Sequence, residues 1–403
     1  MFDKINFFQN LPFSKKIINS NIIKVKKAFN ELRIDIENSE IPLIETFKKD
    51  YNYDFSQTLV KKFSRYKKIF IIGMGGSILG SKSLYSFFKE KIKKEVFFFD
   101  NLDENLITNF NKIKNKNKSC FIIISKSGST LETLANFLTI TKKKIDKNKL
   151  IFITENRDNA LLEIASKYNA EIIEHKEFVG GRYSVLSEVG MLPAILMGLH
   201  VDKFKNFTKL IKNKKFISCL VHDVACIYTL NNKNVTNSIF LTYDSKLYDL
   251  CYWYQQLVGE SLGKQKKGIM PIVSVAPKDN HSLLQLYLDG SRDKFFTFFS
   301  SKNAIKSYKF SGKNIPKTMG YIKNRTLKEI INSQLIATKN VFKSKKIPFR
   351  EFNFIKNNEQ EFGDIIIFLM LETILLARMM KIDPFNQPAV EQVKLKTKKI
   401  LSN

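Results

Sequence analysis

The sequence predicts an α/β protein that contains two parallel, doubly wound sheets in tandem. Two observations support this fold class. Short apolar segments alternate with amphipathic stretches between residues 67 and 175, and a second group of apolar segments follows between residues 237 and 355. Such alternation is typical of parallel strands joined by crossover helices. The strands expected in the first sheet are residues 69–72, 95–99, 120–124, 150–154 and 171–175.

The second half shows a similar pattern without a clean sequence repeat. Its expected helices are residues 186–199, 247–262, 282–289 and 364–380, and its expected strands are residues 237–243, 269–276, 295–300 and 351–355. The polar amino-terminal stretch is expected to be mainly helical. The sequence thus predicts an N-terminal helical segment (1–45), a first subdomain (46–195), a second subdomain (196–380) and a C-terminal helix or tail (381–403).

The chain is strongly basic, with a formal net charge of +29 over 403 residues. We do not expect nucleic acid as a partner, because only 8 of the 67 basic residues are arginine and the lysines are spread along the chain. Nucleic-acid sites favour arginine and clustered basic patches. The lysine-rich segments 111–118 and 141–149 lie between expected elements and predict solvated loops. A basic surface would still attract an anionic substrate.

Cysteine usage and hydropathy predict a cytoplasmic protein. The four cysteines lack the spacing of a metal site, and Cys120 and Cys251 lie in apolar segments, which is typical of buried thiols in a reducing compartment. The first residues lack the apolar run of a secretory signal. The longest apolar run, 365–371, meets Glu372 and is too short to span a membrane. We expect no membrane association, no metal and no cofactor.

The loop that follows the apolar run 120–124 is the strongest functional signal. Its sequence is SKSGST (125–130), and an amphipathic stretch begins at Leu131. A strand, a hydroxyl-rich turn and a helix form a phosphate site, because free backbone N–H groups and the helix dipole face the anion. The sequence therefore predicts that this segment, here called the cradle loop, binds a phosphorylated small molecule.

A second loop of this kind, GMGGS (73–77), follows the first expected strand. Gly73, Gly75 and Gly76 are expected to adopt positive φ and to let a ligand approach the backbone. The spacing also suggests a dinucleotide site, and Asp100 ends the next strand where such a site needs an acidic residue. The nucleotide alternative is weakened but stays open. Two serine-bearing loops after strands favour a phosphosugar.

Four further segments carry side chains suited to catalysis, and each also has a structural interpretation. Arg182 follows a double glycine, which could be a surface turn, and His281 lies at an expected helix start, where a lone histidine is more often structural. Gln256 and Glu260 lie four residues apart on one helical face, which could be a solvated helix end. Lys394 could be one more surface lysine.

Taken together, six segments in sequence order resemble the glucose-6-phosphate isomerase family. They are GMGGSILGS, SKSGSTLET, VGGRYSVLSEVG, QQLVGESLGK, HSLLQLYLDG and FNQPAVEQVK, and they span roughly residues 65–395. The resemblance implies two sugar-isomerase (SIS) subdomains of three αβα layers. It also implies an aldose–ketose isomerase that interconverts glucose 6-phosphate and fructose 6-phosphate through an enediolate, without a cofactor.

The resemblance implies a role for each matching residue. Glu260 would move the proton between C2 and C1, Arg182 would stabilise the enediolate, and Gln256 would contact the sugar. His281 and Lys394 would assist ring opening, with His281 supplied by the partner subunit of a homodimer. The substrate, a phosphorylated hexose, would be held by Gly76, Ser77, Ser125, Lys126, Ser127, Gly128, Ser129 and Thr130.

The chain departs from the family pattern at a few positions, and other functions stay open. Asn280, Glu188, Ala389 and Val393 replace residues common in the family, and the short chain suggests that dimer arms are trimmed. Alternatives are an SIS isomerase of mannose 6-phosphate or an amino sugar, and a non-catalytic phosphosugar-binding regulator. A basic nucleic-acid-binding protein is a weaker third alternative, and its binding would fall steeply with salt.

Overall fold

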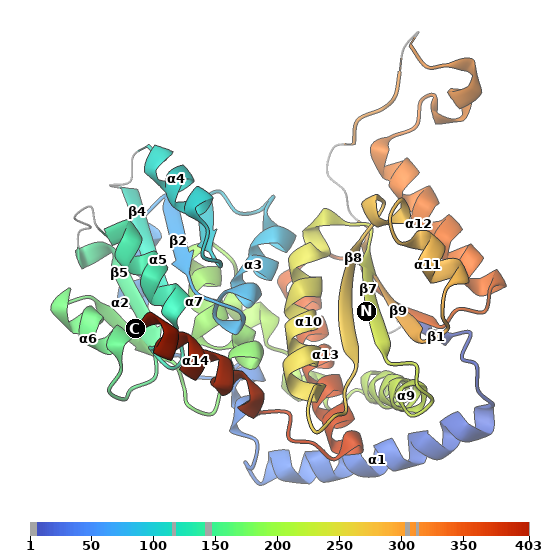
Figure 1. Cartoon of the computed structure of the whole chain (residues 1–403), viewed down its shortest axis with the longest axis horizontal. Coiled ribbons are helices and arrows are strands. Elements are labelled where there is room, and N and C mark those ends of the chain that lie inside the picture. Colours follow the sequence, from blue (N-terminus) through green and yellow to red (C-terminus); the bar gives the residue numbers. More distant parts are fainter. Residues whose placement is uncertain (1–5, 115–117, 142–146, 303–306, 312–313, 403) are drawn as a thin grey trace.

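The computed structural model describes residues 6–114, 118–141, 147–302, 307–311 and 314–402, so parts of both lysine-rich segments (115–117 and 142–146) lie outside the described residues. Within these ranges the chain forms two five-stranded sheets, one in each half (Figure 1). The first sheet is entirely parallel, and its strands in spatial order are β3 (Glu95–Phe99), β2 (Lys68–Ile72), β4 (Ser119–Ile124), β5 (Leu150–Thr154) and β6 (Glu171–Glu174).

The second sheet is parallel except at one edge. Its strands in spatial order are β1 (Asn6–Gln9), β10 (Phe349–Phe354), β9 (Lys294–Ser301), β7 (Asn237–Thr242) and β8 (Met270–Val275). The central strands of both sheets are almost completely buried, which explains why they read as continuous apolar runs. The predicted α/β class with two parallel sheets is confirmed.

Helices cover both sheets and fill the space between them (Figure 1). In the first half they are α2 (Gln57–Ser64), α3 (Gly76–Phe88), α4 (Glu104–Lys112), α5 (Leu131–Thr141), α6 (Ala160–Lys167) and α7 (Glu188–Leu196). In the second half they are α8 (Phe207–Leu210), α9 (Lys214–Asn231), α10 (Tyr248–Leu262), α11 (Leu284–Asp289), α12 (Leu327–Ser344) and α13 (Glu359–Met380). The terminal helices are α1 (Lys15–Glu37) and α14 (Glu391–Leu401).

The expected helical amino-terminal segment is only partly helical. Helix α1 is present, but β1 pairs antiparallel with β10 at the edge of the second sheet. Phe8 of this strand is buried and packs against Phe295 of β9 at a ring distance of 5.9 Å. A four-residue strand is too short to show a period, so only its tertiary partner reveals it.

A protruding arm extends from the second half (Figure 1). Its described residues are 307–311 and 314–326, its two sides are joined by a bridge between Lys309 and Thr326, and it carries the short 3-10 helix η9 (Lys317–Ile322). Tyr308 and Tyr321 are 81% and 74% exposed. The arm thus presents aromatic side chains far from the core.

A buried ion cluster joins three elements behind α10. The guanidinium of Arg350 on β10 donates to Asp223 of α9 at 2.9 Å and to Glu372 of α13 at 3.0 Å. It also donates to the hydroxyl of Tyr254 on α10 at 3.1 Å, and Tyr254 itself donates to Glu372 at 2.5 Å. All four side chains are buried. This cluster fixes α10 against the second sheet.

A second buried polar cluster lies beside α7 and explains one departure from the family pattern. Glu188 is fully buried at the start of α7, where it accepts hydrogen bonds from the Tyr51 hydroxyl at 2.9 Å and from the Asp54 N–H at 3.2 Å. The ammonium of Lys205 lies over the rings of Tyr51 and Tyr53, at 4.2 and 4.0 Å. Burial lowers the pKa of Lys205 to about 7.

Candidate active site

The loop after β2 brings the amino end of α3 against α10. Of its three glycines, only Gly75 has a positive φ, at 52°, so the expectation for Gly73 and Gly76 was wrong. A methyl group added at Gly75 would lie 2.7 Å from the amide nitrogen of Gln256. Ser77 is largely buried in the first turn of α3.

Gly76 is required for a different reason, because it lies against the segment that carries Arg182. A methyl group at Gly76 would be 2.1 Å from the carbonyl carbon of Gly181, so only glycine fits. The hydroxyl of Ser184 donates to the Gly76 carbonyl at 3.2 Å. The 3-10 helix η5 (Gly181–Leu186) is therefore fixed directly on α3.

The cradle loop lies next to this contact. The hydroxyls of Ser125 and Thr130 are hydrogen-bonded at 2.8 Å, and those of Ser127 and Ser129 are 3.1 Å apart. Gly128 has a φ of 64°. The carbonyl oxygen of Ile124, just before the loop, would be 3.2 Å from a methyl group at Gly73. Two post-strand loops therefore meet at one edge of the first sheet, as expected for ligand sites in such sheets.

Lys126 differs from the other cradle residues in its contacts. Its ammonium donates to the backbone carbonyl of Glu177 at 2.7 Å and lies 3.5 Å from the carboxylate of Glu155. Its charge is thus partly compensated within the chain. In this structure Lys126 connects the cradle loop to the segment before η5, which is a structural role that the sequence did not indicate.

Arg182 is buried, and all its guanidinium nitrogens have partners. Its Nε donates to the Ser261 hydroxyl at 2.8 Å, and Nη1 donates to Glu260 and Gln387, both at 3.2 Å. Its Nη2 donates to the carbonyls of Pro384 and Asn386. A cation held by this many acceptors has a fixed position. The surface-turn interpretation of Arg182 is excluded, because the side chain is only 2% exposed.

Glu260 and Gln256 contact each other on the face of α10 that meets the first half. The Gln256 amide donates to Glu260 Oε1 at 2.7 Å, while Arg182 binds Oε2. The Glu260 side chain is 31% exposed and therefore reaches solvent. Gln256 Oε1 is buried and has no hydrogen-bond partner among the described residues. A buried acceptor without a donor is costly, and a ligand hydroxyl would supply the missing donor.

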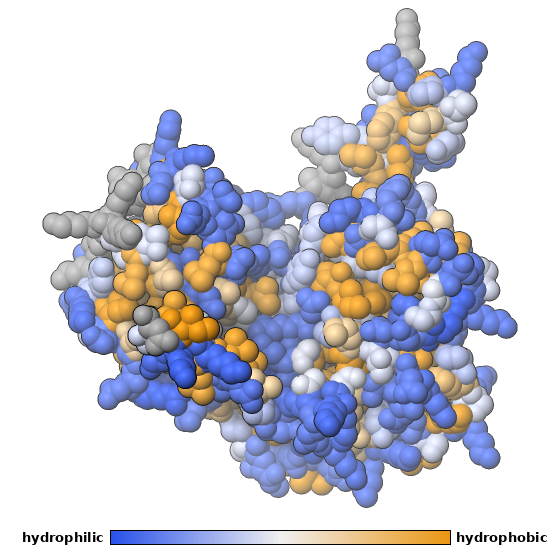
Figure 2. Space-filling model, viewed as in Figure 1, coloured by the Kyte–Doolittle hydropathy of each residue, from blue (hydrophilic) through white to orange (hydrophobic). Residues whose placement is uncertain are grey.

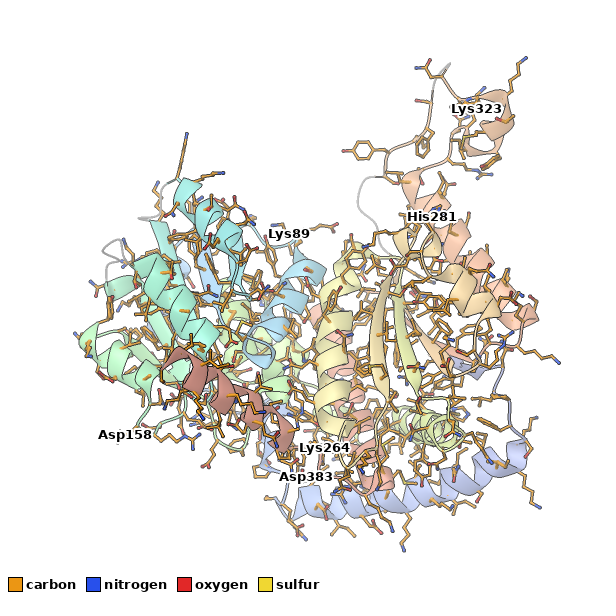
Figure 3. All side chains as sticks on the ribbon, in the orientation of Figure 1. Lys89, Asp158, Lys264, His281, Lys323 and Asp383 are labelled. Atoms are coloured by element: carbon orange, nitrogen blue, oxygen red, sulfur yellow. The ribbon has the colours of Figure 1, made fainter. Side chains whose placement is uncertain are left out.

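Two predicted site residues make no described hydrogen bond or ion pair with this group within the chain. His281 follows the carboxyl end of β8 and is exposed, whereas α10 ends before the amino end of β8. Figure 3 shows His281 and Lys264, which follows α10, at opposite ends of the second half. Lys394 on α14 is 62% exposed and ion-paired with Glu391 at 2.7 Å.

Sequence reasoning missed three side chains that contact Arg182 or its partners. Ser261 accepts from Arg182 and is bonded to the Tyr183 hydroxyl at 3.0 Å, and Gln387 accepts from Arg182. All three lie inside segments that resemble the family: Tyr183 in VGGRYSVLSEVG, Ser261 in QQLVGESLGK and Gln387 in FNQPAVEQVK. The nucleotide alternative loses support here, because Lys82 binds the carboxylate of Asp100 at 2.6 Å.

Comparison with known proteins identifies the family. The phosphoglucose isomerase family model matches residues 55–276, which is more than half of the chain. The chain belongs to the phosphoglucose isomerase family. A glucose-6-phosphate isomerase of Methanocaldococcus jannaschii is 32% identical over 391 residues, covering 93% of each chain. The protein of the same name from Campylobacter jejuni is 29% identical, covering 95% of this chain and 98% of the relative.

Solved structures show the same fold at lower identity. A hypothetical protein from Thermus thermophilus aligns with a TM-score of 0.86 and 22% identity, covering 99% of this chain and all of the other. A glucose-6-phosphate isomerase from Chlamydia trachomatis aligns with a TM-score of 0.70 and 17% identity, covering 86% of this chain and 72% of that one. The predicted family and its two-sheet architecture are confirmed.

The described residues of this phosphoglucose isomerase family member offer no metal cluster and no spanning helix. Among them, no three or more His, Cys, Asp or Glu side chains gather in a way that could hold a metal ion. The helices of the described part of the chain include none with the length and apolar character needed to cross a membrane.

Proposed function

We propose that this chain interconverts glucose 6-phosphate and fructose 6-phosphate, the aldose–ketose isomerisation shared by glycolysis and gluconeogenesis. The contact that carries the proposal joins Arg182 to Glu260 at 3.2 Å, next to the Gly75–Gly76 loop. It places one carboxylate and one permanent cation at a single point. Family membership and relatives named glucose-6-phosphate isomerase support the same reaction.

Glu260 acts as the proton carrier in the proposed mechanism. Its carboxylate removes the proton from C2 of the open-chain aldose and returns it to C1, while the hydroxyl proton on O2 passes to O1, which gives the ketose. Positioned proton transfer contributes roughly 10²–10⁴-fold to a rate. Gln256 holds one carboxylate oxygen, which limits the orientations that Glu260 can take.

Arg182 stabilises the negative charge that develops on the substrate oxygen. Its guanidinium is already held by Ser261, Pro384 and Asn386, so it needs no reorganisation when the enediolate forms. Because arginine stays protonated, its charge is present throughout the reaction. The unpaired Gln256 Oε1 accepts a sugar hydroxyl.

The cradle loop holds the substrate phosphate. Ser125, Ser127 and Thr130 offer hydroxyls at the start of α5, and Gly128 lets the turn close. Gly76 and Ser77 complete the site from α3. The phosphate lies far from C1 and C2, so its binding energy serves to orient the reacting carbons.

The active form is a homodimer in which His281 acts in the partner's site. Within one chain, His281 and Glu260 are separated by the length of β8, about 20 Å for six strand residues. His281 is exposed, and the arm with Tyr308 and Tyr321 presents apolar surface to a second subunit. His281 and Lys394 would then assist opening of the sugar ring.

The reaction takes place in the cytoplasm. All four cysteines are buried and free, which suits a reducing compartment. We keep the expectation that neither nucleic acid nor a membrane is a partner.

A coupled assay with a panel of hexose phosphates tests the proposed reaction. Purified protein is expected to form fructose 6-phosphate from glucose 6-phosphate in the presence of a chelator. Preference for mannose 6-phosphate or an amino sugar phosphate would contradict the proposed substrate. Absence of turnover in folded, dimeric protein that still binds phosphosugars would favour a regulator instead.

The Glu260→Gln variant tests the proposed base. It should bind phosphosugar normally and lose about 10²-fold or more in kcat, because the amide cannot accept the proton. The matched control is Glu163→Gln, which changes an exposed carboxylate on α6 that is paired only with Lys167 in the described contacts. Equal kcat values for the two variants would assign the proton transfer to another group.

A further inference from the structure

A groove between α1 and α9 has the character of a ligand site and shares no lining residue with the candidate active site. Its volume is about 590 Å³, within the range typical of small-molecule pockets. It lies on the lower side of the second half, where Figure 1 shows α9 above α1. The lining residues are Ile22, Lys26, Phe29, Asn30, Arg33, Lys214, Ile217, Ser218, Val221 and His222.

The lining comes from one stripe of each helix. Successive residues of α1 in the groove are spaced by four, three, one and three positions, and those of α9 by three, one, three and one. This is the spacing of a single helical face. The stripe on α1 extends over about 17 Å and that on α9 over about 12 Å, at 1.5 Å per residue. Figure 1 shows α9 nearly end-on above α1, so the two stripes meet where the helices cross.

The chemistry of the lining is both apolar and cationic. Ile22, Phe29, Ile217 and Val221 supply hydrocarbon surface, and Figure 2 shows how such apolar patches alternate with polar ones over the visible face of the molecule. Four of the ten residues have basic side chains, compared with about one in six in the whole chain, and none of these ten is acidic. The basic side chains are Lys26, Arg33, Lys214 and His222.

The positive charge of the groove is partly compensated, since the His222 ring lies 3.6 Å from the carboxylate of Asp223. Arg33 forms an ion pair with Glu37 at 3.5 Å, but both side chains are about half exposed or more. Such exposed pairs contribute little, so a bound anion could displace Glu37 at small cost. Burial of a hydrocarbon chain would add roughly 0.8 kcal/mol per CH₂ group.

We propose that the groove binds a small amphiphilic anion, a molecule with a hydrocarbon body and one carboxylate or phosphate. The apolar side chains accommodate the body, and the basic side chains bind the head. The proposal is independent of the isomerase reaction.

Titration with octanoate tests the proposal, with calorimetry as the readout. The wild-type protein should bind one octanoate saturably. Octanol, which has the same chain without the charge, should bind at least about tenfold more weakly, and acetate should not compete. Equal affinity for octanoate and octanol, or no saturable binding of octanoate, would overturn the proposal.

Two sets of variants locate the binding. Lys26→Gln combined with Arg33→Gln should weaken octanoate binding at least about tenfold. Lys24→Gln combined with Lys27→Gln makes the same charge change on exposed parts of α1 outside the groove and should leave binding unchanged. Equal affinities for the two double variants would place octanoate elsewhere and contradict the proposal.

Filling the groove gives a second, independent measurement. Ser218 is small and exposed, so Ser218→Trp should block octanoate while the melting temperature stays near that of the wild type. If this variant instead dissociates a dimer, the groove is an interface between copies of the chain and the proposal fails.

Discussion

The indole nitrogen of Trp253 donates to the backbone carbonyl of Arg182 at 3.2 Å. Trp253 is buried on α10, one turn before Gln256 and two turns before Glu260. The same helix therefore holds the backbone of Arg182 at one point and its side chain at another, through Ser261. The cation and the carboxylate of the candidate site are positioned by one rigid element.

Trp253→Phe should disturb both stability and activity. The substitution removes the donor to the Arg182 carbonyl and leaves a cavity, which together cost on the order of 1–4 kcal/mol. We expect a lower melting temperature and a fall in kcat, because η5 loses a support. Tyr252→Phe, at the exposed neighbouring position, is the control for thermal unfolding and steady-state kinetics. Wild-type kcat in Trp253→Phe would show that η5 is positioned without this bond.

Ser261→Ala should reduce catalysis more than substrate binding. The variant leaves the Nε–H of Arg182 without its acceptor at 2.8 Å. A hydrogen bond to a charged group is worth about 1.5–3 kcal/mol, which corresponds to a tenfold to hundredfold loss in kcat if Arg182 acts on the enediolate. The expected KM changes little. Kinetics of Ser282→Ala, an exposed serine, provide the comparison. A rise in KM alone would assign Ser261 to substrate binding.

Gly76→Ala should separate η5 from α3. The added methyl group would overlap the Gly181 carbonyl carbon at 2.1 Å, and the backbone must move because neither segment is a flexible side chain. Overpacking of this kind costs about 1–3 kcal/mol. Activity should fall with stability, because the shift moves Arg182. Gly320→Ala has no heavy atom within 4 Å of the new methyl group among the described residues and should be nearly neutral in both assays. Unchanged melting of Gly76→Ala would contradict the close contact.

Lys205→Met should stabilise the protein in a pH-dependent way. Burial lowers the pKa of Lys205 from 10.5 to about 7 in the folded chain. Between these values the unfolded chain binds the proton and the folded chain does not, so the Lys205 contribution to stability rises with pH. The gain from Lys205→Met should therefore be larger at pH 6 than at pH 9. Thermal unfolding at both pH values, with exposed Lys203→Met as control, provides the measurement. A gain that is equal at both pH values would show that Lys205 keeps an ordinary pKa.

Arg350→Met should be one of the most damaging single changes in the second half. It would leave the buried carboxylates of Asp223 and Glu372 without their cation, and loss of one partner of a buried pair costs about 3–5 kcal/mol. Replacing Asp223 and Glu372 by leucine in the same chain should recover much of this loss. Urea unfolding of the single and triple variants measures the loss of stability and its recovery. A single variant as stable as the wild type would mean that the cluster is not buried in solution.

The sequence was sufficient for the strands that follow β1, because they leave local patterns, and it singled out the candidate residues by their motifs, whose roles stay predictions. Central parallel strands such as 120–124 are buried on both faces and read as apolar runs. The hydrogen bonds of Arg182 could not be predicted in this way. Its acceptors come from residues 260–261 and 384–387, and no local pattern reports a contact across 80 or 200 positions. Glu188 was equally hidden, since its donors, Tyr51 and Asp54, belong to an earlier loop.

His281 follows the carboxyl end of β8, whereas Glu260 lies on α10 beside Gly259, which faces Pro271 near the amino end of that strand. This separation has a consequence for mixed assemblies. In the proposed dimer, a subunit without the Glu260 carboxylate still places its His281 imidazole in the partner's active site. Co-assembly of Glu260→Gln chains with His281→Ala chains would therefore restore one complete active site in each hybrid dimer. A homodimer of either variant alone would contain no complete active site. Genetic complementation between two inactive alleles is the outcome that this geometry allows.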